Sequence, residues 1–333
     1  MKRPKTLRVG LAIAVTAIFA TQAHAEAIKI GVSKVLSYSA APIALEKGYF
    51  KAEGFDAELV FFESAQPIAV AVTSGGIDYG VAGVTAGLYS LAGQGALKII
   101  GGAAAEAPGF HNFAYLVSNR AFDSGLKSFK DLPGRTLALT QVGTTLYYNF
   151  GQLADKYGFD IKTVRVVALQ SNPNVISGLA GGQADFAVMP AATALPALAK
   201  SEIRLMGWVG DETPGAQTSL ILTSSKAAND KPDQVNRFLR AYRHGARDYH
   251  DAFIGADEKP HDGPGAPQLL PILSKFVELS PGQVKEGLPW IDAEGRLNVK
   301  DVIHQIEWDK AQGLLKPEID GKNFIDMRFV VER

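Results

Sequence analysis

The segment QVGTT at residues 141–145 combines residue types that can bind a negatively charged group. Gly143 lets a ligand approach the backbone closely, and Thr144 and Thr145 place hydroxyl groups beside the unpaired N–H groups of a helix start. Such a start favours an anion, because the N–H groups and the helix dipole present partial positive charge. In the alternative interpretation Thr144 only caps its own helix. Because the segment follows a predicted strand, both interpretations stay open.

Side-chain combinations typical of catalysis are missing from the sequence. The chain contains no Cys, which excludes cysteine nucleophiles, disulfides and thiolate metal sites. It has no Gly-x-Ser-x-Gly motif, and the Ser-x-x-Lys at 124–127 lacks its companion motifs. The histidines after residue 25, at positions 111, 244, 250, 261 and 304, show no spacing that would place two metal ligands on one helical face. The sequence therefore predicts a protein that is not an enzyme and uses no cofactor and no metal.

Two internal copies of one pattern are expected to position the polar segments. Residues 72–81, VTSGGIDYGV, align without gaps with residues 179–188, LAGGQADFAV, at an offset of 107. Ser64 and Ser171 lie at the same offset, and residues 97–102 precede 203–208 by 106. Matches in the same order predict two lobes of similar topology. Asp78 and Asp185 occupy equal places in the copies, and we expect each to bond nearby backbone N–H groups in a turn.

Each copy alternates short apolar runs rich in β-forming residues with longer amphipathic or Ala-rich segments. The predicted strands are residues 28–32, 57–62, 79–82, 97–101, 113–118, 136–140, 165–169, 186–189, 203–208 and 219–223. The predicted helices are residues 40–47, 66–74, 85–92, 145–157, 174–180, 191–200, 232–252, 268–277 and 299–312. This alternation predicts an α/β fold with two lobes, each a mainly parallel sheet flanked by helices, joined by two crossover strands. We expect lobe 1 at residues 26–112 plus 218–333 and lobe 2 at residues 113–217.

The N-terminal residues are typical of an export signal. MKRPKTLR carries four basic side chains, an apolar run follows from Val9 to Ala20, and the Ala-x-Ala at 23–25 predicts cleavage after Ala25. The run is shorter than the ~20 residues that a membrane-spanning helix needs. Cleavage would remove four of the 34 basic residues and none of the 34 acidic residues, leaving a formal charge of −4. This balance argues against nucleic acid as a partner. Without a Cys for a lipid anchor, we expect a soluble protein of the periplasm.

Ligands of open parallel sheets bind beyond the carboxyl ends of the strands, so the repeat also predicts a site. The strand-end loops are residues 33–39 and 83–85 in lobe 1 and residues 141–145, 171–172 and 190–193 in lobe 2. His111 lies beside the first crossover and is a further candidate. The aromatic residues Tyr38, Tyr147, Tyr148, Phe110 and Trp208 could wall a pocket.

Several motifs resemble one family of transport proteins. The run ALEKGYFKAEGFDAELV at 44–60, preceded by IKIGVSK and followed by SGGIDYGVAGV, resembles the substrate-binding proteins of ABC importers for nitrate, sulfonates, taurine and pyrimidine precursors. The later segments LVSN, DLPGRTLALTQVGTT and IEWDKAQGLL extend the resemblance over almost the whole chain after residue 25.

The resemblance implies a type II periplasmic binding fold with the ligand enclosed between the lobes. The resemblance also implies that the residues corresponding to the family's ligand-binding loops contact the ligand here. These are Tyr38, Ser39, Gly83, Val84, Thr85, Gly143, Thr144, Thr145, Asn172, Met189 and Pro190. The chain departs from the sulfonate binders at residues 188–191, VMPA, where they tend to have charged or bulky polar residues. This apolar strand end favours an organic ligand over a small inorganic anion.

The resulting expectation is a monomeric solute-binding protein that captures a small anionic organic molecule and delivers it to an ABC permease. Two alternatives stay open. An exported sensor would present the ligand to a membrane receptor. An enzyme similar to the eukaryotic pyrimidine synthase of thiamine biosynthesis would need that enzyme's cysteine-rich motif, and this chain has no Cys.

Overall fold

The computed structural model describes residues 25–333. The predicted export signal, residues 1–25, lies outside the described residues apart from Ala25. Within residues 25–333 no helix is long and apolar enough to cross a membrane.

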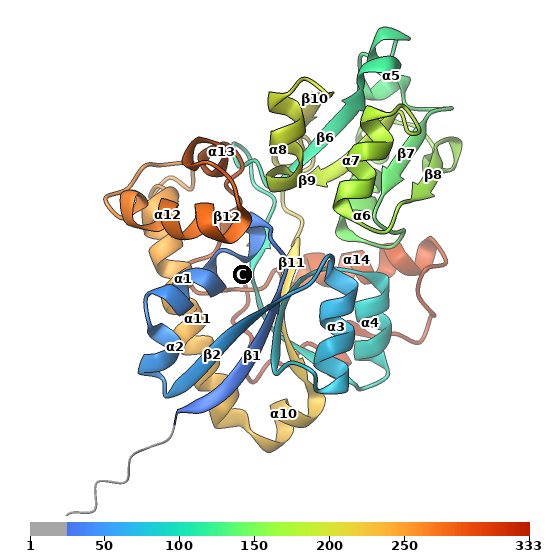
Figure 1. The fold of residues 1–333 in the computed structure, drawn as a ribbon. Coiled ribbons are helices and arrows are strands. Elements are labelled where there is room, and N and C mark those ends of the chain that lie inside the picture. Colours follow the sequence, from blue (N-terminus) through green and yellow to red (C-terminus); the bar gives the residue numbers. More distant parts are fainter. Residues whose placement is uncertain (1–24) are drawn as a thin grey trace, which may run out of the picture.

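The first sheet contains five strands in the order β2 (Phe55–Phe61), β1 (Glu26–Val32), β3 (Tyr79–Gly83), β11 (Ser219–Ser224) and β4 (Leu97–Gly102). β1 pairs in parallel with β2 and β3, and β11 runs antiparallel to β3 and β4. In Figure 1, α3 (Ala65–Ser74) and α4 (Ala86–Gly93) lie on one side of this sheet. The other side is covered by α1 (Ala40–Glu46), α2 (Tyr49–Ala52) and α11 (Pro232–Phe253). We call this sheet with its helices lobe 1.

The second sheet also contains five strands, in the order β10 (Ile203–Trp208), β6 (Phe113–Ser118), β9 (Phe186–Pro190), β7 (Thr136–Leu139) and β8 (Arg165–Ala168). β7 is parallel to β8 and β9, whereas β6 is antiparallel to β9 and β10. Its helices are α5 (Asn119–Asp123), α6 (Thr145–Tyr157), α7 (Asn172–Ala180), α8 (Ala191–Ala199) and α9 (Val209–Glu212). We call this unit lobe 2 (Figure 1).

The chain passes twice between the lobes, and the two passages bond to each other. The Thr218 N–H donates to the Ala104 carbonyl at 2.9 Å, and the Glu106 N–H donates to the Ala216 carbonyl at 2.9 Å. Each passage leads directly into the antiparallel strand of its sheet, β6 or β11, so each sheet is mainly parallel with one reversed strand. The expected α/β fold with mainly parallel sheets and two crossovers is confirmed.

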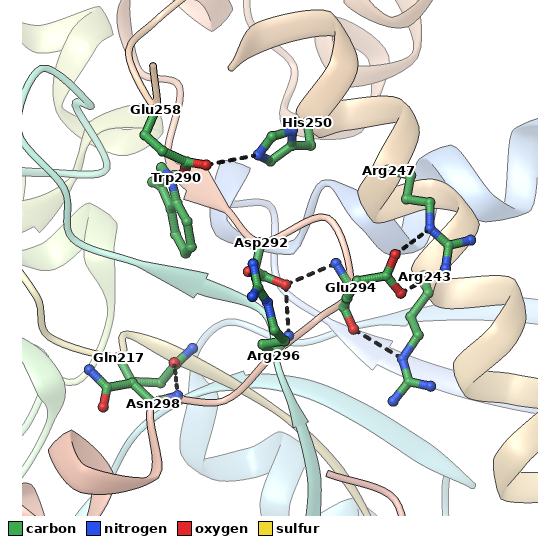
Figure 2. Close-up of polar contacts among 10 residues, drawn as sticks. All are labelled: Gln217, Arg243, Arg247, His250, Glu258, Trp290, Asp292, Glu294, Arg296 and Asn298. Atoms are coloured by element: carbon green, nitrogen blue, oxygen red, sulfur yellow. Dashed lines mark hydrogen bonds and ion pairs between the residues drawn. The ribbon is translucent and has the colours of Figure 1, made fainter. Parts of the chain in front are cut away.

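The C-terminal part of the chain packs on lobe 1 and on the crossovers. It forms α10 (Ser225–Asp230), α12 (Ala266–Val277), α13 (Pro281–Glu286) and α14 (Val299–Ala311), and β12 (Trp290–Ile291) pairs with β5 (Ala104–Ala105) of the first crossover. Figure 2 shows two of its anchors: the Arg247 guanidinium bonds both carboxylate oxygens of Glu294 at 2.7 Å, and the Asn298 N–H donates to Gln217 of the second crossover at 3.0 Å.

The two aspartates of the repeat have equivalent structural roles. The Asp78 carboxylate accepts from the Lys29 N–H at 2.8 Å, and the Asp185 carboxylate accepts from the Thr136 N–H at 2.9 Å. Each aspartate also donates its own N–H to the carbonyl of the same partner. Both therefore fasten the start of a central strand to its parallel neighbour. The expected backbone-binding role is confirmed, although the N–H belongs to a neighbouring strand and not to a local turn.

The lobe boundaries agree with the division of the strands. Every strand of the first sheet falls within residues 26–112 or 218–333, and every strand of the second falls within residues 113–217. We therefore propose these ranges as the two domains. The α-helices that the sequence did not predict, α2, α5, α9, α10 and α13, have four to six residues, which is too short for a helical period to emerge.

Candidate functional site

A pocket lies where strand-end loops of both lobes meet. It has an empty volume of about 630 Å³, part of which is open to solvent. We call it the interlobe pocket. Its lining residues are Ser33, Val35, Ser37, Tyr38, Glu63, Ser64, Ala65, Gln66, Gly83, Val84, Thr85, Phe113, Thr140, Gln141, Thr144, Thr145, Leu146, Asn172, Pro190, Thr218 and Ser219.

The lining residues of lobe 1 follow β1, β2 and β3. The Tyr38 hydroxyl accepts from the Gly83 N–H at 2.7 Å, which joins the loop after β1 to the end of β3. Burial raises the pKa of Tyr38 above its usual value, so the phenol is neutral and can donate to a ligand. The Thr85 hydroxyl accepts from the Leu88 N–H at 2.9 Å, as a helix cap does, and donates to the Gln66 side-chain carbonyl at 2.5 Å. These bonds hold the side chains of three loops in fixed positions.

The starts of α4 and α6 face each other across the boundary between the lobes. The Ala86 N–H donates to the Gly143 carbonyl at 2.7 Å, and the Thr145 N–H donates to the Val84 carbonyl at 3.0 Å. Gly143 has a φ of 75°, and a Cβ atom there would lie 3.0 Å from the Ala86 Cβ atom. Glycine therefore suits both the left-handed backbone conformation and the close approach of the lobes.

The two threonines of the QVGTT segment take part in these contacts. Thr144 caps α6, with its hydroxyl 3.4 Å from the Tyr147 N–H. The Thr145 hydroxyl donates to carbonyls of lobe 1, those of Val84 and Thr218, at 3.3 and 3.4 Å. The cap interpretation of Thr144 is confirmed, and the first N–H of α6 is bonded to protein.

A hydrogen-bonded chain leads from the pocket lining into the crossovers. The Ser37 hydroxyl donates to the Asn112 side-chain carbonyl at 2.6 Å. The Asn112 amide donates to Glu106 at 2.8 Å and to the Thr218 hydroxyl at 3.2 Å. Burial raises the pKa of Glu106 to about 8, so this carboxyl is mostly protonated at neutral pH. These hydrogen bonds therefore fix two lining residues, Ser37 and Thr218, to both crossovers without a buried charge.

Eight of the twelve expected ligand residues line the pocket: Tyr38, Gly83, Val84, Thr85, Thr144, Thr145, Asn172 and Pro190. Four do not line it, and each has another role. Ser39 is buried and donates to the Leu36 carbonyl at 2.6 Å. The His111 ring stacks on Trp208 with centroids 4.2 Å apart, and its Nδ1 lies 2.9 Å from the Glu286 carbonyl. Gly143 supports the contact between the lobes, and Met189 is fully buried in the core of lobe 2.

Several lining residues were not predicted from the sequence, in particular Glu63, Ser64, Ala65 and Gln66 at the start of α3. The repeat contained a signal for them, because Ser64 matches Ser171, which lies directly before the expected Asn172. Phe113, Thr218 and Ser219 were also missed; they lie where the two crossovers enter the sheets. Within the described residues, no group of three or more His, Cys, Asp or Glu side chains could hold a metal ion.

Comparisons with known proteins agree with this architecture. The alkanesulfonate-binding protein SsuA of Xanthomonas axonopodis pv. citri, solved with MOPS, is 18% identical and has a TM-score of 0.71 over 90% of this chain and 97% of its own. The periplasmic nitrate-binding protein NrtA of Synechocystis PCC 6803 is 14% identical, with a TM-score of 0.68 over 90% and 85%. An enzyme, the desulfurization enzyme DSZB, is 15% identical, with a TM-score of 0.59 over 91% and 97%.

These solved structures show that the fold is the type II periplasmic binding fold, as expected. None of the curated proteins matches the chain by sequence. The model of one family, described as NMT1/THI5 like, matches residues 38–252. Because this match spans more than half of the sequence, the chain belongs to the NMT1/THI5-like family.

Proposed function

We propose that this protein is the periplasmic solute-binding component of an ABC importer and that it encloses a small organic molecule in the interlobe pocket. The observation that carries the proposal is the composition of that pocket: loops from both lobes line it, and the lobes are joined by two bonded crossovers. Such an architecture can close over a ligand by bending at the crossovers, provided that the ligand binds the closed form more tightly.

Solute-binding proteins among the similar solved structures support the same proposal. Two of the similar structures are named as an alkanesulfonate-binding and a nitrate-binding protein. A periplasmic location, a monomeric state and an inner-membrane permease as partner belong to this proposal. The absence of Cys argues against the enzyme alternative that needs a cysteine-rich motif.

A blocked pocket provides the test. Ala65 lines the pocket at the start of α3, whereas Val70 on the same helix is 50% exposed. We expect Ala65→Phe to abolish the rise in melting temperature that a bound solute produces, because a ligand stabilises the folded state only if it binds there. Val70→Phe should keep the rise. Equal ligand-dependent stabilisation in both variants would show that the ligand binds elsewhere.

The sensor alternative uses the same pocket, so binding measurements do not separate it from import. Uptake by the cognate permease, reconstituted in proteoliposomes with the wild-type protein or with Ala65→Phe, does separate them. An importer component should drive uptake only with an open pocket. Binding without any uptake would favour the sensor.

A further inference from the structure

The interlobe pocket contains one ionisable acid and no base. Among its lining residues Glu63 is the only Asp or Glu, and Lys, Arg and His are absent. Glu63 is exposed, directly before the start of α3. Within residues 25–333 its carboxylate has no ion-pair partner. A negatively charged ligand would therefore meet an uncompensated negative charge at the pocket and no cationic side chain.

Helix starts do not replace the missing cation. The starts of α4 and α6 bond their first N–H groups to carbonyls of the opposite lobe, Gly143 and Val84, as described above. In α7, Ser171 accepts from the Asn174 N–H and residue 173 is Pro, which leaves only the N–H of Asn172 at that start. The start of α3 is similarly limited by Pro67 and lies next to Glu63. An anion in the pocket would therefore have only neutral donors, without a cationic side chain to balance its charge.

Two polar groups of lobe 1, the Ser33 hydroxyl and the Glu63 carboxylate, are free to bond a ligand in the pocket. The Ser33 hydroxyl is buried at 6% exposure, lines the pocket and has no hydrogen-bond partner within the described residues. A buried hydroxyl without a partner is costly, and a ligand group that bonds it would remove that cost. The Ser33 hydroxyl can donate as well as accept, so of these two free groups of lobe 1 only the Glu63 carboxylate is restricted to accepting hydrogen bonds.

We propose that Glu63 determines the specificity of the site: the ligand is a small organic molecule without net negative charge, and it carries an amine or amide N–H group that Glu63 recognises. This inference rests on the proposed solute-binding function and narrows it. The sequence favoured an anionic ligand because of the helix start at Thr144 and Thr145, and there the first N–H and the Thr145 hydroxyl already bond lobe 1.

Matched pairs of solutes test the inference. The panel contains amines and amides with the corresponding anions, such as nicotinamide with nicotinate and benzylamine with benzoate, together with nitrate and ethanesulfonate. Thermal shift identifies binders and calorimetry gives their Kd values. We expect the binders to be uncharged or cationic, with their anionic counterparts inactive.

Glu63→Gln gives the second readout, and Glu58→Gln is its control, because Glu58 is an exposed acid of β2 outside the pocket lining. Loss of a charge-assisted bond should weaken an amine about tenfold in Glu63→Gln and leave Glu58→Gln unchanged. Added salt should reduce the difference.

The outcomes separate the two proposals. If anions bind and Glu63→Gln binds them more tightly, the charge selection is overturned while the solute-binding function stands. If amines bind equally well to wild type and Glu63→Gln, the role of Glu63 is overturned. If no solute stabilises the wild type, the proposed function itself fails. Because Glu63 is exposed and makes no bond within the described residues, equal melting temperatures of the free proteins should confirm that the variant folds.

Discussion

Substitution of Gly143 by Ala would test whether contact between the lobes contributes to ligand affinity. At a φ of 75° an alanine strains the backbone, at a cost of about 1–2 kcal/mol. Its Cβ atom would also lie 3.0 Å from the Ala86 Cβ atom of lobe 1, well below the 3.5–4.0 Å at which carbon atoms attract each other. The first cost affects folding of lobe 2, whereas the second arises only when the lobes are in contact.

The magnitude follows from the bonds that the added methyl group would disturb. Two backbone hydrogen bonds join the lobes at this point, from Ala86 to Gly143 and from Thr145 to Val84. At about 0.5–1.5 kcal/mol each, their loss would destabilise the closed form by about 1–3 kcal/mol. Because a ligand that requires closure loses the same free energy, its Kd should rise about 5- to 150-fold.

Gly134→Ala is the matched control. Gly134 also lies in lobe 2 with a φ of 80°, but a Cβ atom there would have no neighbour within 4 Å. Both variants should unfold more readily by similar amounts, which chemical denaturation measures, and only Gly143→Ala should lose affinity in calorimetry with the best-binding solute. Equal affinities of the two variants would refute the link between this contact and ligand binding.

Three further predictions concern stability and the threonines. Asp78→Ala should lower the free energy of unfolding by about 1–3 kcal/mol, measured by urea denaturation, because the Lys29 N–H loses its acceptor; unchanged stability would contradict the strand-fastening role. Because the pKa of Glu106 rises from 4.5 to about 8 on folding, the unfolded chain loses the proton first, and stability should fall by about 1.4 kcal/mol per pH unit between these values. Glu106→Gln should remove this part of the pH dependence and be the more stable form at pH 8; parallel curves would show that Glu106 is ionised when folded. Thr144→Ala combined with Thr145→Ala should cost about 1 kcal/mol of stability through the lost cap and also weaken binding, whereas a lower melting temperature with unchanged Kd would leave only the capping role.

Features that repeat along the chain could be predicted from the sequence. Asp78 and Asp185 occupy equal places in both copies, and the structure gives them the same partner geometry. The alternation of strands and helices likewise predicted both sheets. Since ligands of such sheets bind at the carboxyl ends of the strands, the region of the pocket followed directly.

Side-chain direction was less accessible to sequence reasoning. Met189 and Pro190 are neighbours on β9, and neighbouring residues of a strand point to opposite faces, so one side chain enters the core and the other lines the pocket. Ser39 precedes α1, and its side chain turns back onto the preceding helical turn. Which neighbour of a pair faces the ligand depends on register, which local sequence does not specify.

Contacts between the lobes were not predictable from either copy alone. The QVGTT segment has the composition of an anion site, but its first helical N–H and the Thr145 hydroxyl bond the Val84 carbonyl of lobe 1, 61 residues earlier in the chain. Glu63 was missed for a related reason: a single exposed acid carries no pattern. Its position becomes informative only when the other lining residues, none of them basic, are known.

The distance between the lobes, with and without ligand, tests the central claim most directly. Because the chain has no Cys, Asp56→Cys in lobe 1 and Lys162→Cys in lobe 2, both at exposed positions, allow two spin labels to be attached at defined places. We predict that the solute giving the largest thermal shift moves the distribution of label-to-label distances to shorter values and narrows it. Gly143→Ala should reduce this ligand-induced shortening. An identical distribution at saturating solute would contradict a binding protein that closes over its ligand.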